Sequence, residues 1–472
     1  MSRLFETRPD DDGLPGPERR IAVLVLVLGT LMAVIDTTMI NIALPSIARD
    51  LNVSASRAVW VLSLFQIVCA ATLLLFASLS ELLSRRRLYV AGLALFTLAS
   101  LGAALSRSLE TLLVFRALQG LGAAATLSIG PSLYRVIFPT RLLGAAMGVS
   151  ALVVAGGYAS GPTLGGLVLA VTDWPWLFAM HVPLGLLALS LALRALPAEP
   201  RRRGGFDMLG AALSATMLAS FFLGLDALGH GAGVGKILML LAASLVAGWL
   251  FLRRQRRASH PLLPLSLFDE PRFTLAVLVS GLAFVGQGLA FVALSFLYQQ
   301  EMGLSPLQTA WLFTPWPLTI MFAAPLAGRL ADRVNPAALS TSGLVLLLCG
   351  LMSLAMLADD AGVIDSLWRT ALCGLGFGLF QAPNNREMMS SVPKARSANA
   401  SGMMSTTRTI GQSLGVALVG LFLAAGLGSV QASLWLGCVA LSGAVLISLR
   451  RIPLTSAPSR ESERQCPSPH SD

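Results

Sequence analysis

The sequence predicts an all-α integral membrane protein that crosses the bilayer many times. Of its 472 residues, 55% are hydrophobic and only 12% are charged, whereas a soluble domain carries about 25% charged residues. The apolar residues form continuous runs long enough to span the roughly 30 Å hydrocarbon core, which takes about 20 residues as a helix. Continuous runs also exclude a β-barrel, whose strands alternate apolar and polar residues.

The apolar runs divide the chain into fourteen expected spans joined by short connections. No connection is long enough to fold as a soluble domain, and the longest, RALPAEPRRRGGFD, is a linker. The fourteen segments cover residues 21–45, 57–77, 87–106, 111–134, 143–170, 174–196, 207–227, 236–252, 273–298, 306–329, 337–357, 364–386, 401–426 and 431–449.

The net charge of +10 reflects membrane topology rather than nucleic-acid binding, because the basic residues cluster in short loops without interleaved aromatic residues. Of 34 Lys and Arg residues, five fall in loops on one side and two inside spans, which leaves 27 on the side of both termini. Cytoplasmic loops carry the excess of positive charge. We therefore expect a multi-pass protein of the bacterial inner membrane with both termini in the cytoplasm.

A weak internal repeat suggests how the spans are grouped. The segment 77–87 follows the second span and the segment 328–333 follows the tenth, and both place an acid four residues after a small residue and then arginine. Transporters are often built from two such halves. Eight spans lie between the repeats instead of six, so two spans are inserted between two six-helix bundles. The expected domains are a cytoplasmic tail at 1–20, an N-terminal bundle at 21–200, two inserted helices with linkers at 201–260, a C-terminal bundle at 261–450 and a disordered cytoplasmic tail at 451–472.

The first span carries one ionisable residue, Asp36, near its middle. An Asp at the bilayer centre costs about 2.5 to 3.5 kcal/mol, so Asp36 must face protein or water rather than lipid. A carboxyl group removed from water takes up a proton more readily, which makes Asp36 a candidate reversible proton carrier. The alternative is a structural Asp bonded to a neighbouring helix.

The fourth span carries Arg116 in the sequence RALQGLG. A guanidinium at this depth must face water or an acid, or else its side chain extends to the interface. The small residues Gly120 and Gly122, which follow Gln119, allow another helix to approach closely.

The fifth span carries a stripe of glycines at Gly157, Gly161 and Gly165. Residues four apart share one helix face, so the stripe forms a smooth surface, and Pro162 bends the helix there. Such a face suits a sliding helix contact or ordinary close packing.

The second half of the chain carries aromatic and amide side chains within its spans. Span ten is expected to be irregular because it contains Pro315, Pro317 and Pro325. Aromatic residues beside amides suit a cavity for a flat or cationic ligand, although the amides could equally bond the backbone freed by Pro383. The residues of interest are Trp316, Phe377, Phe380, Gln381, Asn384 and Asn385.

Several function classes lack their sequence signatures. There is no GxxxxGK[ST] loop, which argues against an ATP-driven pump. The five cysteines form no CxxC pair, the four histidines stand singly, and no nucleophile–base pair or cluster of metal ligands is visible. We therefore expect no enzyme, no metal and no cofactor, with a proton gradient as the energy source. A membrane-embedded receptor or enzyme would need a soluble sensor or a polar catalytic cluster.

Taken together, these motifs resemble the major facilitator superfamily, in particular its fourteen-span drug/proton antiporters, which include multidrug and quaternary-ammonium exporters. The resemblance covers nearly all of residues 20 to 450. It rests on IDTTMINIALP at 35–45, RALQG at 116–120, GGYASGPTLGG at 156–166 and PNNREMMSSVP with the following ASGMMSTTRTIGQSLG. The loop after the second span departs from the pattern, with Ala77, Glu81 and Ser84 where the family has Gly, Asp and Gly.

The resemblance implies the major facilitator fold and export of amphipathic compounds, cations among them, by proton-coupled alternating access. It implies that Asp36 and Arg116 couple the proton. The implied antiporter motif is Gly157, Gly161, Pro162, Gly165 and Gly166. The expected substrate-cavity residues are Asn41, Gln66, Gln119, Trp316, Phe377, Phe380, Gln381 and Asn384. The implied gating loops contain Glu81, Arg85, Gly328, Asp332 and Arg333.

The alternative is an exporter of one specific metabolite, coupled to sodium or facilitative. No acid lies between Glu301 and Asp332, where several family members carry one, and this weakens the expectation of divalent-cation substrates. The partners expected are a small-molecule substrate and the lipid bilayer, without nucleic acid. The sequence does not decide whether a periplasmic adaptor and an outer-membrane channel take part.

Overall fold

The computed structural model describes residues 13–139, 142–197, 207–258, 261–263, 265–331, 333–357, 362–392, 397–425 and 430–456, without some side chains inside α2, α5, α15 and α16. Regular structure in this part of the chain is entirely helical. The helices are α1 (Gly16–Asp50), α2 (Ala55–Leu82), α3 (Arg85–Ala104), α4 (Leu109–Ile137), α5 (Leu143–Val171), α6 (Pro175–Ala179), α7 (His181–Ala195), α8 (Met208–Gly229), α9 (Val234–Gln255), η3 (Leu265–Leu267), α10 (Pro271–Phe296), η4 (Leu297–Glu301), α11 (Pro306–Phe313), α12 (Pro315–Leu330), α13 (Pro336–Ala355), α14 (Val363–Ser390), α15 (Ser397–Ala425) and α16 (Val430–Ser456).

Thirteen helical segments in the described residues are long and apolar enough to cross a membrane. They match thirteen of the fourteen spans expected from the sequence. The remaining expected span, the fifth, is the 29-residue helix α5. The all-α membrane architecture predicted from composition is confirmed.

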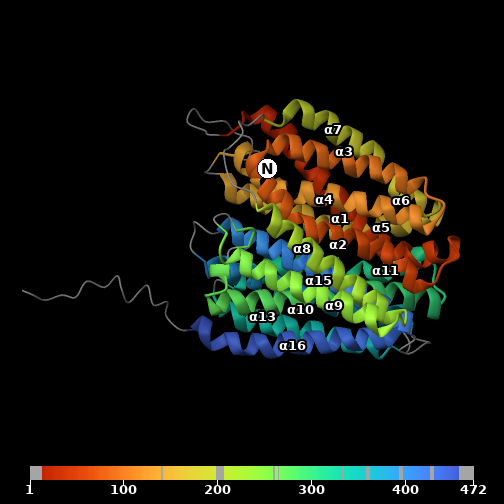
Figure 1. Ribbon diagram of the computed structural model, residues 1–472. Helices are drawn as coiled ribbons and strands as arrows, with labels where there is room; N and C mark the ends of the chain where they lie inside the picture. Colours follow the sequence, from red (N-terminus) through yellow and green to blue (C-terminus); the bar gives the residue numbers. More distant parts are fainter. Residues whose placement is uncertain are drawn as a thin grey trace, which may run out of the picture.

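The helices form two groups with α8 and α9 beside them (Figure 1). In the first group α1 packs on α5 and α7, and α4 packs on α2 and α3; in the second, α10 packs on α15 and α16, and α14 packs on α12 and α13. Helices α8 and α9 pack on each other, and α8 contacts both α2 and α15, where the two groups meet. The predicted domain boundaries at residues 200 and 260 lie outside the described residues.

Prolines and local unwinding interrupt several spans. The tenth span is irregular, as its prolines predict: α11 ends at Phe313 and α12 begins at Pro315. Proline lacks the backbone N–H that a continuous helix would use. At its far end α10 passes into the π-helix η4 (Leu297–Glu301).

The hydrophobic packing differs between the two ends of the bundle. We call the end where α1 begins and α16 ends the terminal end, and the opposite end the far end. One buried cluster joins Ile42 and Val59 of the first group to Leu294 and Phe313 of the second, and these residues lie toward the far end. Toward the terminal end, the described clusters around Tyr89 stay within the first group, and those around Phe273 or Leu339 within the second. A smaller cluster around Ile67 and Phe222 joins α2 to α8 and α15 nearer the middle, so the extended packing across the two groups lies at the far end.

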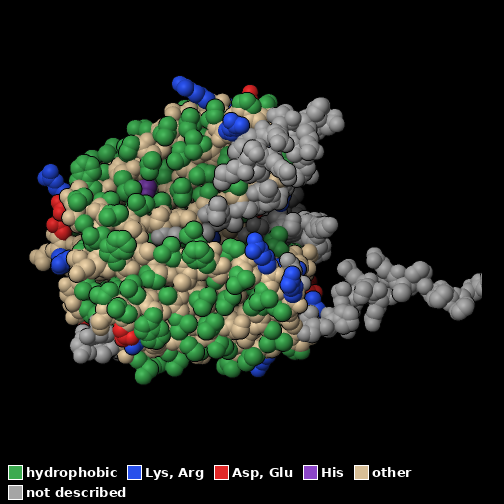
Figure 2. Space-filling view, turned by 180° about the vertical axis from the view of Figure 1, so that it is seen from behind, with side chains coloured by type: hydrophobic (Ala, Val, Ile, Leu, Met, Phe, Trp, Pro, Cys, Tyr) green, Lys and Arg blue, Asp and Glu red, His purple; other side chains and the backbone are tan. Residues whose placement is uncertain are grey.

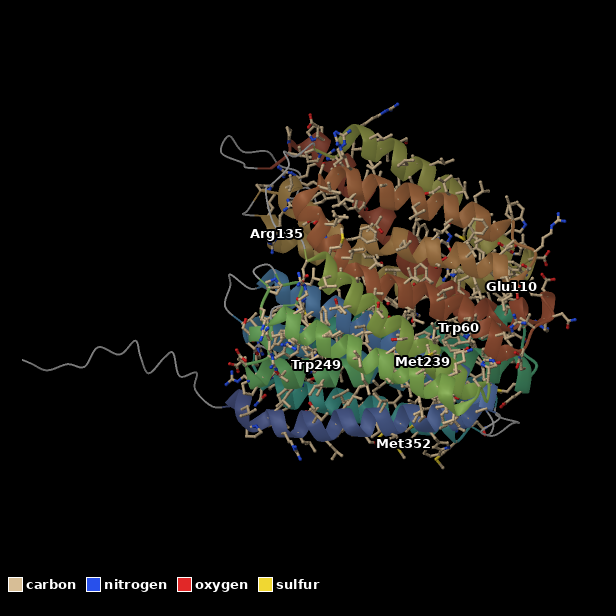
Figure 3. All side chains as sticks on the ribbon, in the orientation of Figure 1. Trp60, Glu110, Arg135, Met239, Trp249 and Met352 are labelled. Atoms are coloured by element: carbon tan, nitrogen blue, oxygen red, sulfur yellow. The ribbon has the colours of Figure 1, made fainter. Side chains whose placement is uncertain are left out.

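Polar contacts also cross the seam in the middle and at the far end. Gln299 Nε2 donates to the Ile42 carbonyl at 2.8 Å. Trp60 Nε1 donates to Asp226 Oδ1 at 2.6 Å and ties α2 to α8; Trp60 lies toward the far end in Figure 3. The Asp226 carboxylate is therefore engaged by an indole.

The outer surface is apolar. Hydrophobic side chains cover most of the face in Figure 2. Trp249 and Met239 on α9 and Met352 on α13, labelled in Figure 3, are 59%, 63% and 38% exposed. Large apolar side chains facing outward are typical of a surface in contact with lipid.

Candidate functional site

The centre of the first helix group contains a buried ion pair between α1 and α4. Arg116 Nη1 lies 2.7 Å from Asp36 Oδ2, and neither side chain is exposed. Two charges at this depth are tolerated because each supplies the counter-charge that water would otherwise provide. Of the alternatives left open for Arg116, the structure places it against an acid and not at the interface.

Other groups fix the arginine in place. Arg116 Nε donates to the Val61 carbonyl at 2.7 Å, and Nη1 donates to Gln119 Oε1 at 2.8 Å. Its guanidinium lies 4.4 Å from the centre of the Phe65 ring. Gln119 in turn donates to Ser100 Oγ at 2.8 Å, so Gln119 supports the arginine and is fully buried.

The pair is not completely satisfied. Asp36 Oδ1 and Arg116 Nη2 are buried and have no hydrogen-bond partner. A buried charged atom without a partner is costly. The pair therefore has one open acceptor and one open donor for a proton, a water or a rearranged neighbour.

Sequence reasoning missed His181, a buried histidine near this pair. Its Nδ1 lies 2.9 Å from the Leu177 carbonyl, its ring meets Phe96 edge to face at 5.7 Å, and it is 1% exposed. Phe178, three residues before it, places its ring 5.5 Å from the Arg116 guanidinium. A lone histidine within the apolar sixth span was the available signal.

The glycine stripe of α5 lies against α1 beside Asp36. A Cβ built on Gly161 would lie 1.7 Å from Thr38 Oγ1, and one on Gly157 would lie 2.9 Å from a Val34 methyl. Gly165 faces the Met39 backbone at 3.2 Å. This stripe lets α5 approach the segment of α1 that carries the acid.

The next glycine faces the other helix group. A Cβ on Gly166 would lie 2.3 Å from the Cβ of Ala310 in α11. Close by, Thr163 Oγ1 and Thr314 Oγ1 are 3.0 Å apart. Pro162 is buried within the continuous helix α5. The two faces of this motif therefore contact α1 and α11 at the same time.

A narrow polar cavity lies between the helix groups. About 20 Å³ is open to the centre of a water molecule, which is room for about one water. The lining comes from five helices: Thr37, Thr38 and Asn41 of α1, Gln66 of α2, Tyr158 of α5, Gln287, Gly288 and Phe291 of α10, and Gln412 and Val416 of α15.

The polar atoms of the cavity are amides and hydroxyls. Gln412 bridges the groups, since its Nε2 donates to Gln287 Oε1 at 3.0 Å and its Oε1 accepts from the Tyr158 hydroxyl at 3.3 Å. The amide oxygens of Asn41 and Gln66 are buried without a partner. Of the sequence candidates, Asn41 and Gln66 lie at this cavity, whereas Tyr158, Gln287 and Gln412 were missed because amides and phenols in spans usually serve packing.

The aromatic candidates of the second half lie behind the cavity wall. Trp316 is 1% exposed, and its ring is 5.0 Å from that of the lining residue Phe291. Phe377 and Phe380 are buried and meet each other edge to face at 5.8 Å. Gln381 is partly buried on α14 and is not among the lining residues.

Asn384 lies in a second buried network nearer the terminal end. It accepts a hydrogen bond from Arg451 Nη1 and donates to the Ala276 carbonyl at 3.3 Å. Arg451 also lies 3.4 Å from Glu387 and donates to Ser340 Oγ at 3.1 Å. These contacts join α10, α13, α14 and α16, so Asn384 holds the second group together.

A comparison with family models decides the identity of the fold. The model of the Major Facilitator Superfamily matches residues 26–416. The chain belongs to the major facilitator superfamily.

Relatives of this superfamily member are named as transporters. It is 42% identical over 414 residues to the "uncharacterized transporter YebQ" of Escherichia coli. This match covers 87% of this chain and 91% of the relative. It is 28% identical over 409 residues to the "riboflavin transporter RibZ" of Clostridioides difficile, with 86% and 89% covered. Other relatives at 30 to 32% identity are named as multidrug or antibiotic resistance proteins or as a multidrug efflux pump.

Solved structures show the same fold. A D-xylose–proton symporter superposes with a TM-score of 0.67 at 16% identity, covering 93% of this chain and 98% of that one. The expected major facilitator fold is confirmed, and the chain is a transporter, not an enzyme.

The superfamily's gating loops are only partly visible. The Glu81 side chain and Asp332 lie outside the described residues. Arg85 begins α3, and Arg333 is exposed just after α12. Gly328 has open space around its Cα.

Proposed function

We propose that this transporter exports amphipathic small molecules from the cytoplasm in exchange for protons. The observation that carries the proposal is the buried Asp36–Arg116 pair directly beside the cavity. Asp36 is followed in α1 by Thr37 and Thr38, which line the cavity. Movement of α1 would therefore change the acid and the binding surface together.

The ion pair supports coupling because its two charges depend on each other. Protonation of Asp36 would leave Arg116 as an uncompensated buried charge, a costly state. The pair must therefore open, or α1 must shift against α4, when the proton is taken up. The carboxylate is sealed from water in this conformation, so proton exchange belongs to another step of the transport cycle.

The glycine stripe of α5 supports the same cycle. The smooth contact of Gly157, Gly161 and Gly165 with α1 would permit sliding, while Gly166 packs on α11 at the closed far end. With the termini in the cytoplasm, as the excess of basic loops indicates, this conformation is closed toward the outside. Residence in a bacterial inner membrane is part of this proposal.

A second candidate is the export of one specific metabolite. Two observations favour it. One is the similarity to a relative named as a riboflavin transporter, and the other is a cavity lined by amide side chains, whose hydrogen bonds have fixed directions. Both candidates use the same cavity and differ in selectivity.

The test is uphill transport in proteoliposomes with a pH-sensitive dye inside. We expect substrate addition to move protons in the opposite direction, and Asp36→Asn to stop uphill transport while exchange of labelled for unlabelled substrate continues. An Asp36→Asn variant that still concentrates substrate would refute the coupling role of this residue. A resistance panel in a host deleted for its own pumps would identify the substrates.

A further inference from the structure

Arg408 is a cationic side chain within a membrane span that the coupling scheme leaves unused. It lies on α15, inside the candidate span Gly402–Ala425. Within the described part of the chain, no carboxylate forms an ion pair with it and no hydrogen bond from its guanidinium is found. Ionisable residues in spans are expensive and mark functional paths.

Contacts of α15 establish where Arg408 points. One face, with Gly411 and Gly415, packs on α10. A second face, with Ile410 and Leu414, packs toward α2 and α8. The third face carries residues 408, 412 and 416, spaced four apart and therefore on one side of the helix.

Two members of this third face line the cavity. Gln412 and Val416 are among the lining residues, and Arg408 lies one helical turn from Gln412 toward the terminal end. The side chain is partly exposed. Arg408 is thus placed at the approach to the cavity from the side that the proposed function assigns to the cytoplasm.

Residues of α2, on the opposite side of the cavity, place Arg408 at the same height along the bundle. Gln66 of α2 lines the cavity, and Cys69 lies three residues further toward the terminal end. The buried residues Ile67, Ala70 and Ala71 of α2 pack with Ile410, which lies two residues after Arg408 on α15. Contacts of both α2 and α15 therefore place Arg408 on the terminal-end side of the cavity.

The charges around the cavity have one sign. None of its lining residues is an acid, and Asp36 is held by Arg116. The remaining lining groups are amides, hydroxyls and the aromatic ring of Phe291, which stacks on Phe313 at 5.3 Å. This surface offers a cation no carboxylate, whereas it offers an anion a guanidinium.

We propose that the cavity and Arg408 bind an amphipathic organic anion. Its acidic group pairs with the Arg408 guanidinium, which favours carboxylate or phosphate geometry. Once the two helix groups separate enough to widen the present one-water cavity, its flat body lies between Tyr158 and Phe291, with the open amide oxygens of Asn41 and Gln66 facing its donors. The assignment rests on the proposed export function and names its substrate class.

The charge of the substrate has a consequence for energetics. Export of a monovalent cation for one proton moves no net charge, but export of an anion for a proton moves charge in the direction that an inside-negative potential drives. Anion export would therefore draw on the membrane potential as well as the pH gradient.

The first experiment measures binding to the purified full-length protein by equilibrium dialysis. The probes share one aromatic body: naphthoate, naphthamide and naphthyltrimethylammonium. We expect naphthoate to bind at least tenfold more tightly than the other two, Arg408→Gln to reduce it to the level of the amide, and Arg408→Lys to keep the preference. Arg257→Gln, a surface arginine near the terminal end of α9, serves as the matched control.

Several outcomes would overturn the anion site. They are the absence of naphthoate binding, equal or tighter binding of the ammonium probe, and unchanged naphthoate binding in Arg408→Gln. A melting curve for each variant separates loss of binding from loss of fold, and the comparison of the three probes on the unmodified protein keeps the test decisive if Arg408→Gln does not fold.

The second experiment separates this assignment from the coupling proposal. In proteoliposomes we expect net naphthoate transport to accelerate when a potassium diffusion potential makes the donor side negative, with protons moving the opposite way. Net naphthoate transport without proton movement would refute the coupling and support the anion site. Proton movement driven by the ammonium probe and not by naphthoate would refute the anion site and support the coupling.

Discussion

Asp36 of α1 and Arg116 of α4 are 80 positions apart in the chain, yet their side chains form a 2.7 Å ion pair without any exposed surface. The guanidinium is further held by the Val61 carbonyl and by Gln119. The strength of this arrangement depends on keeping both charges, because either one alone would be buried without compensation.

The first prediction is a double-mutant cycle on this pair. Asp36→Asn and Arg116→Gln should each destabilise the protein by about 3–5 kcal/mol, the cost of leaving one buried charge unpaired. The double variant should recover part of this loss. Thermal unfolding in detergent measures all four proteins, and strictly additive losses would show that the charges do not interact.

The second prediction concerns the contact between α5 and α1. Gly161→Ala should lower transport and thermal stability because its Cβ would lie 1.7 Å from Thr38 Oγ1 and 2.7 Å from Thr38 Cβ, and rotation of the hydroxyl cannot relieve the second contact. Gly156→Ala is the matched control, since its Cβ would meet nothing within 4 Å. Equal activity of the two variants would contradict a close contact here.

The third prediction concerns closure of the far end. Gly166→Val should push α5 away from α11, because even a Cβ at this position meets Ala310 at 2.3 Å. The far end should then open more often, and a cysteine introduced by Thr163→Cys should react faster with a membrane-impermeant maleimide. Gly156→Val in the same background is the control, and unchanged reactivity in Gly166→Val would argue against this gate.

The fourth prediction is a pH dependence at the start of α8. Asp207 caps this helix by accepting from Gly210 N–H at 2.9 Å, and it also accepts from Gln255 at 2.9 Å and from Arg254. Burial acts to raise the pKa of Asp207, but these hydrogen bonds and the nearby Arg254 charge outweigh it and lower the pKa.

Because the folded pKa lies below the unfolded value of about 3.9, the stabilisation is full above that value and is lost as the pH falls through the folded pKa. Asp207→Asn should destabilise the protein at neutral pH because it removes the charge that pairs with Arg254, whereas Asn caps a helix about as well as Asp. The difference in melting temperature between the two proteins should shrink below about pH 4. A difference that stays constant with pH would show that the charge of Asp207 is not involved.

Several features of the fold follow from local sequence. Long apolar runs leave no choice but membrane-spanning helices, because backbone groups in lipid must bond within their own segment. The break between α11 and α12 follows from the prolines of the tenth span, and the four-residue spacing of the α5 glycines predicts a smooth face. These are properties of a single segment, so they can be read without knowing its neighbours.

The sequence of one segment does not show which other helices it packs against. The sequence marked Asp36 and Arg116 as costly residues, but only packing of α1 on α4 made them partners. Gln119 was expected at the cavity and instead supports the arginine, and Asn384 instead joins Arg451. Conversely, Tyr158, Gln287 and Gln412 meet only because α5, α10 and α15 converge.

The sequence by itself determined that this protein lies in a membrane, which segments cross it, and which charged residues need a partner there. The tertiary structure alone decided which partner each received and which face of each helix borders the cavity. The physical reason is that the cost of burying a charge is set by the residue and its depth, whereas the group that offsets the cost comes from a helix distant in the chain.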